Sequence, residues 1–134
     1  MAKLFSLTFD YTPKWKGNRA RAEADRITVR LRDFTESKRI QLLEKMRESV
    51  VDKMNGQDGN DFAGAVAVKK KNLELSLELF NAYFVSVENL ALDLGGDEPK
   101  KITTAADLCE HCEDLVLEIA GRLTSGADAD EIKN

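Results

Sequence analysis

Apolar and polar residues alternate in two short segments near the amino terminus. A period of two residues is typical of a strand that buries one face. The alternating apolar residues are Phe5, Leu7, Phe9, Ile27, Val29 and Leu31. We therefore predict strands at about 3–11 and 25–33, paired with each other as an antiparallel hairpin.

The segment between these strands has no periodic apolar face. Residues 12–24 contain Pro13, Gly17 and Asn18 together with many charged residues, a composition typical of a loop. Because this loop is too long for a tight turn, the apolar faces of the strands must determine their pairing. We predict a long basic loop at 12–24, mobile at its tip.

A helix is predicted at about 36–54, because apolar residues recur there at spacings of three and four. Thr35 precedes the pattern and is a suitable N-cap. The apolar positions of this face are Ile40, Leu43, Met46, Val50 and Met54. Asn55 and the polar residues after it are typical of a loop.

A second helix is predicted at about 68–83, although residues 72–79 also alternate as a strand would. The stretch lacks β-branched residues and is rich in Leu and Glu, which favour helix. From Val85 the composition changes, and we predict a short second hairpin at about 85–102. Thr103 or Thr104 then caps a third helix at about 104–123, either continuous or with a break near Glu113. Its apolar positions are Leu108, Leu115, Ile119 and Leu123.

These elements predict an α+β fold. A chain of 134 residues is long enough for one domain with a real core, which we place at 1–124, followed by a disordered acidic tail at 125–134. No apolar run is long enough to cross a membrane, and Met1–Thr8 does not resemble a signal peptide. We therefore expect a cytoplasmic protein.

The residues that usually carry catalysis are scarce. His111 is the only histidine, and it lies between the only two cysteines, Cys109 and Cys112. These three residues are a weak candidate for a metal site, because a structural zinc site needs a fourth ligand. A redox pair is a further alternative, but packing of the thiols as small apolar groups is favoured. We expect no enzyme activity and no cofactor.

Charge is distributed unevenly along the chain. Residues 1–32 hold eight bases and three acids, a balance of +5, whereas the remainder holds twelve bases and 21 acids, a balance of −9. In the basic loop, Trp15, Lys16, Arg19 and Arg21 could contact a nucleic acid or an acidic protein. The alternative is that Trp15 folds back onto the apolar face of the hairpin.

Two stretches carry a resemblance to a known family. Phe84-Val-Ser-Val-Glu-Asn-Leu90 and Lys101-Ile-Thr-Thr-Ala-Ala-Asp-Leu108 resemble the small tail assembly chaperones of long-tailed bacteriophages and prophages. The likeness in layout covers most of residues 25–123. The basic loop and the cysteine pair are not features expected of that family.

The resemblance implies a non-enzymatic helper in the bacterial host cell that keeps a tape measure protein soluble during tail assembly. A tape measure or tail tube protein would be its partner, and the oligomeric state, a homo-oligomer included, stays open. An apolar groove or surface is needed for such a helical client. Most of the apolar residues in 40–54 and 73–84 are expected to be core, with Leu75 and Leu79 as the external surface. The alternative function is a small nucleic-acid-binding or acidic-protein-binding module that uses the basic hairpin.

Overall fold

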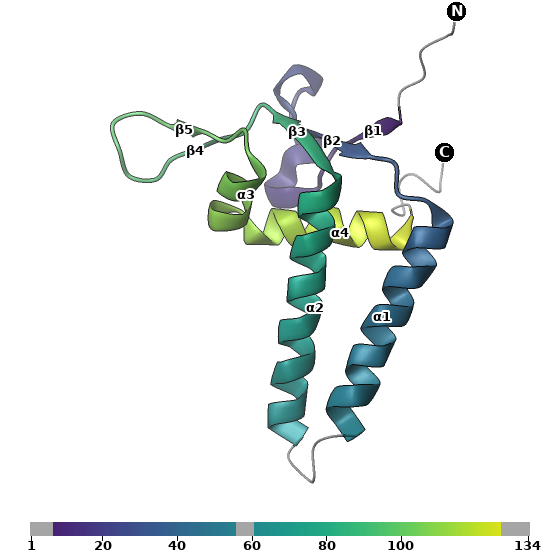
Figure 1. Ribbon diagram of the computed structural model, residues 1–134. Coiled ribbons are helices and arrows are strands. Elements are labelled where there is room, and N and C mark those ends of the chain that lie inside the picture. Colours follow the sequence, from purple (N-terminus) through teal and green to yellow (C-terminus); the bar gives the residue numbers. More distant parts are fainter. Residues whose placement is uncertain (1–6, 56–60, 127–134) are drawn as a thin grey trace, which may run out of the picture.

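A three-stranded antiparallel sheet forms one layer of the molecule. The computed structural model describes residues 7–55 and 61–126. Strands β1 (Thr8–Tyr11), β2 (Thr28–Arg32) and β3 (Phe84–Glu88) follow the order β1-β2-β3 (Figure 1). The fold is α+β, as predicted, and the N-terminal hairpin of β1 and β2 is confirmed.

The third strand of this sheet was expected in a separate hairpin. β3 instead pairs with β2, and Val87 lies opposite Val29 with both side chains buried. Burial of this pair against the core explains why residues 84–88 join the first sheet. The small second hairpin is present but shorter than predicted, consisting of β4 (Ala91–Leu92) and β5 (Lys100–Lys101).

Asn89 separates β3 from β4. Its φ angle of 63° lies in the left-handed region, which Asn adopts more readily than most residues. Its side-chain Nδ2 donates hydrogen bonds to the carbonyl oxygens of Ala24 and Arg26, each at 3.1 Å. The chain therefore turns at Asn89, and the first strand of the hairpin expected at 85–102 becomes two strands, β3 and β4.

Two long antiparallel helices leave the sheet layer together. α1 (Glu36–Asn55) agrees with the prediction, and the backbone N–H of Lys38 donates to Thr35 Oγ1 at 3.3 Å as an N-cap requires. α2 (Asp61–Tyr83) confirms helix over strand for residues 72–79, but it begins earlier than predicted. The predicted start missed residues 61–67, because Gly64 and the alanines give this stretch little apolar periodicity.

The last helical region is divided in two. α3 (Ala105–His111) begins behind Thr104, whose Oγ1 accepts a hydrogen bond from the Asp107 N–H at 3.1 Å. The helix predicted at 104–123 breaks at Cys112, where φ is −133° and ψ is 47°, directly before Glu113, the place considered for a break. α4 (Glu113–Ser125) follows and ends at Gly126 in the left-handed conformation. The rest of the predicted acidic tail, 127–134, lies outside the described residues.

The core lies between the inner face of the sheet and α4, with α2 packed against both (Figure 1). The four apolar side chains expected to face the core in the last helical region are all completely buried, which confirms their predicted spacing. Completely buried side chains include Val29, Leu31, Phe80, Leu108, Leu115, Ile119 and Leu123. No helix in the described part of the chain is long and apolar enough to cross a membrane.

α1 and α2 continue beyond α4 on the side away from the sheet (Figure 1). Ile40 and Leu43 are 50% and 48% exposed, so the expectation that the apolar face of this helix is mostly core fails for these two residues. Leu42 packs against the core instead, and Met46 is half-buried. The side chains of Val50 and Met54 lie outside the described residues. Among the described residues, the parts of α1 and α2 beyond α4 pack against each other, and apolar side chains on these helices remain in solvent.

Candidate functional site

Asn18 organises the loop that sequence analysis expected to be mobile at its tip. Its side chain is completely buried, and its Nδ2 donates to the carbonyl oxygens of Pro13 and Ile27 at 2.8 and 3.0 Å. Its Oδ1 accepts a hydrogen bond from the Ile27 N–H at 2.7 Å. The loop contains 3-10 turns at Trp15–Ala20 and Glu23–Asp25 and is tied to the start of β2.

The four residues proposed to bind a partner in this loop differ in burial and in the contacts that they make. Trp15 is half-buried and packs against the core, which favours the alternative in which it folds back. Lys16 Nζ lies 4.9 Å from the centre of the Trp15 ring, and Arg19 Nε donates to Thr12 O at 2.8 Å. Arg21 is exposed. Three of the four side chains, those of Trp15, Lys16 and Arg19, are therefore engaged within the protein.

The cysteine pair lies where α3 meets α4. Cys112 is buried and Cys109 is half-buried. Burial raises the pKa of both thiols above their ordinary value of 9.0, and for Cys109 the nearby Glu113 raises it further. A raised pKa disfavours the thiolate that metal binding and redox chemistry need. His111 Nε2 lies 3.7 Å from Glu110 Oε2, and the described residues contain no cluster of three or more ligands able to hold a metal ion.

A large open cavity of about 640 Å³ lies beside the turn between β3 and β4. Its charged lining consists of Asp25, Glu88 and Lys101. Neither histidine nor cysteine lines it, so its walls lack the usual nucleophile and base pairs.

A narrower groove runs between α1 and α2 where the helices leave the rest of the protein. It has a volume of about 260 Å³, which is below the range of about 300–1,000 Å³ that is typical of small-molecule pockets. Its lining from both helices and the preceding loop comprises Phe34, Lys38, Gln41, Leu42, Lys45, Leu75, Glu78, Leu79 and Tyr83. The dimensions suit individual side chains better than a whole small molecule.

Leu75 and Leu79 lie in this groove, but they are not the external surface that sequence analysis predicted. They are only 8% and 7% exposed, because α1 packs over the stripe that would otherwise face solvent. The sequence showed the stripe but not the helix that covers it. What remains accessible is a groove, with the two leucines and the aromatic rings of Phe34 and Tyr83 among its walls.

Charged side chains line the groove along with these apolar walls. Lys38 and Lys45 come from α1, and both side chains are exposed. Lys38 Nζ lies 5.9 Å from the centre of the Tyr83 ring. Glu78 comes from α2. Within the described residues, none of these three charges forms an ion pair.

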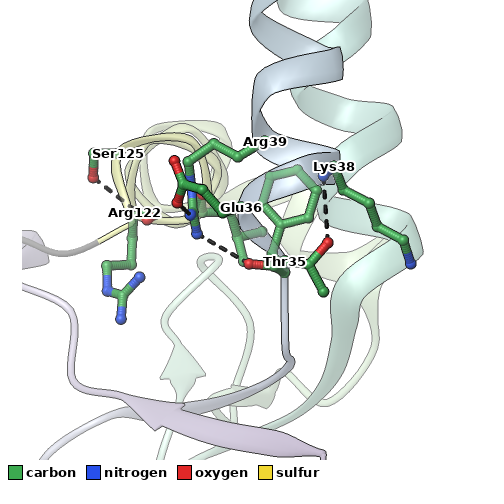
Figure 2. Close-up of polar contacts among 8 residues, drawn as sticks. Thr35, Glu36, Lys38, Arg39, Arg122 and Ser125 are labelled. Atoms are coloured by element: carbon green, nitrogen blue, oxygen red, sulfur yellow. Dashed lines mark hydrogen bonds and ion pairs between the residues drawn. The ribbon is translucent and has the colours of Figure 1, made fainter.

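Arg39 fixes the base of α1 against the end of α4. Its Nε donates to the Leu123 carbonyl at 2.8 Å, its Nη2 donates to the Phe34 carbonyl at 3.1 Å, and its Nη1 pairs with Glu36. The guanidinium also lies over the Phe34 ring, 5.4 Å from its centre. Figure 2 shows Arg39 reaching from α1 to the end of α4. This contact sets where α1 leaves the body and so helps to position the groove.

Sequence analysis missed the α1 half of the groove. Lys38, Leu42 and Lys45 are spaced by four and three residues and therefore share one face, a signal that was available. The apolar pattern of Ile40, Leu43 and Met46, on a different face of the same helix, is stronger and hides this spacing. Phe34 and Tyr83 stand next to predicted helix ends, where spacing carries little information.

Comparison with protein-family models, with curated proteins and with solved structures finds no match to this chain.

Proposed function

We propose that this protein is a non-enzymatic tail assembly chaperone of a long-tailed bacteriophage or prophage, acting in the cytoplasm of the bacterial host. Its client would be a helical, tape-measure-type protein that it keeps soluble during tail assembly. The observation that carries the proposal is the apolar groove between α1 and α2, two helices that continue beyond the body (Figure 1). The motif resemblance at 84–90 and 101–108 names the family.

The packing of two antiparallel helices supports a helical client. Such a pair leaves a long groove on each side, and the side chains of a third helix fit a groove of this kind. The groove between α1 and α2 has apolar walls and charged neighbours, a combination that binds an amphipathic helix and stays compatible with water. Ile40, Leu43 and Val66 add exposed apolar area on the same helices.

Co-expression with the tape measure protein tests the proposal. The wild-type protein should keep this client in the soluble fraction and co-purify with it. Gln41→Trp places a large side chain in the groove from an exposed position and should abolish co-purification while circular dichroism and the melting temperature stay unchanged.

Arg47→Trp is the matched control, because Arg47 is exposed on the same helix, does not line the groove and lies on the opposite side of α1 from Leu42 and Lys45. This variant should bind the client as the wild type does. The proposal is wrong if the client stays insoluble and unbound with the wild-type protein. If Arg47→Trp blocks binding and Gln41→Trp does not, the client contacts the opposite face of α1.

A further inference from the structure

We infer that the groove selects an amphipathic helix carrying two acidic residues seven positions apart along one edge of its apolar stripe. The inference rests on the proposed function, because it specifies the chemistry of the client that the same groove accepts. It is carried by the placement of Lys38, Lys45 and Glu78 around the apolar walls.

The two lysines are placed to contact one partner helix simultaneously. They lie seven residues apart on α1, which is two turns and about 10.5 Å along the axis. A client helix packed nearly parallel or antiparallel to α1 repeats its own edge positions with the same spacing. Acidic residues at positions i and i+7 of the client would therefore meet Lys38 and Lys45 together.

Neither lysine forms an ion pair with a carboxylate in the described part of the chain. Lys38 lies over the Tyr83 ring and Lys45 has no carboxylate within ion-pair distance there. By contrast, Lys71, farther along α2, lies 4.0 Å from Glu74. Two unpaired ammonium groups beside an apolar groove attract a carboxylate-bearing partner and disfavour a basic one.

The apolar walls require that the partner be amphipathic. Leu42, Leu75 and Leu79 line the same groove as the lysines of α1 and the carboxylate of α2. A stripe of leucine-like side chains at spacings of three and four would fill this space. Glu78, contributed by α2, favours a basic residue on the opposite edge of the same client helix.

Two synthetic peptides of about 18 residues test the inference by fluorescence anisotropy. Both carry the same leucine stripe, and they differ only at two edge positions seven apart, which hold Glu in one peptide and Lys in the other. The wild-type protein should bind the Glu peptide roughly tenfold more tightly than the Lys peptide. Lys38→Glu/Lys45→Glu should reverse this preference.

The double variant is expected to fold. Both positions are exposed, and Glu at position 38 would complete a capping box with Thr35. Lys69→Glu/Lys70→Glu is the control with the same change in net charge at exposed positions of α2 outside the groove. This control should retain the wild-type preference for the Glu peptide.

Three results would overturn the inference. Equal binding of the two peptides, blocked in both cases by Gln41→Trp, would leave the groove as the binding site and remove the acidic requirement. Failure of the wild-type protein to bind either peptide would reject the proposed client chemistry. Co-purification with the tape measure protein would then test the proposed chaperone function separately. Self-association in sedimentation velocity that Lys38→Glu/Lys45→Glu abolishes would identify a second copy of this chain as the occupant.

Discussion

Asn18 holds together a loop that has no regular apolar pattern. Its buried amide satisfies two carbonyl groups and one N–H group. Truncation to Ala would leave these groups without partners away from water, and each such loss is costly. Asn18→Ala should lower the free energy of unfolding by about 2–4 kcal/mol, measured by urea denaturation.

Asn81 offers a matched control for this measurement. It is exposed, and its Nδ2 donates to the Leu77 carbonyl at 2.9 Å within the same helix. Asn81→Ala should change the free energy of unfolding by less than about 0.5 kcal/mol. Equal effects of the two substitutions would contradict the structural role assigned to Asn18.

The buried thiol of Cys112 makes stability depend on pH in the alkaline range. Burial raises its pKa above 9.0 in the folded state, so folding favours the protonated thiol. This contribution to stability is fully present below the unfolded pKa and is lost as pH rises through the folded pKa. Cys112→Ala should abolish this part of the alkaline loss in urea denaturation at increasing pH.

Alkylation by iodoacetamide gives a second readout of the same thiol. The native protein should react at Cys112 far more slowly than the urea-unfolded chain at neutral pH, because the thiolate is the reactive form. Rapid alkylation of the native thiol at neutral pH would contradict its burial and would reopen the redox alternative.

At the scale of elements, α1 is joined to the body through Arg39. Lys at this position keeps the positive charge but cannot reproduce the planar guanidinium that reaches both Leu123 O and Phe34 O. Arg39→Lys should lower the free energy of unfolding by about 1–3 kcal/mol. Arg47→Lys, at an exposed position of the same helix, should have almost no effect in the same urea titration.

Gly126, at the end of α4, lies on the other side of the contact that Arg39 makes with α4. A Cβ at this residue would lie 3.2 Å from Arg39 Cζ, and its φ of +84° is strained for other residues. Gly126→Ala should therefore also destabilise the protein, by about 1 kcal/mol or more. A neutral effect would mean that the end of α4 does not pack against Arg39 as described.

The elements that could be predicted from sequence are those with strong local periodicity. The β1–β2 pair, α1, and helix over strand at 72–79 all followed from spacing and composition. The pairing of β3 with β2 did not, because it depends on Val87 meeting Val29 across more than fifty residues of chain. The turn at Asn89 also went unpredicted as an element boundary, since it is a local backbone choice with a weak sequence signal. The break at Cys112 lies next to Glu113, where sequence analysis had considered one.

At the scale of the whole molecule, the candidate site was only half predictable. The leucine stripe that includes Leu75 and Leu79 was visible in the sequence, but its burial under α1 is a tertiary contact. The uneven charge drew attention to the basic loop, whereas Arg30 pairs with Asp10 at 3.0 Å and Arg32 donates to Ala82 O. The groove became visible only when α1 and α2 were placed side by side.

The central claim is that a helical client lies in the groove between α1 and α2. Site-specific photo-crosslinking in cells that co-express the tape measure protein tests it most directly, with a benzoylphenylalanine at position 41 or at position 47, on the opposite side of α1. The account predicts a covalent adduct with the client from position 41 and little or none from position 47. An adduct from position 47 alone, or from neither position while the client co-purifies, would contradict it.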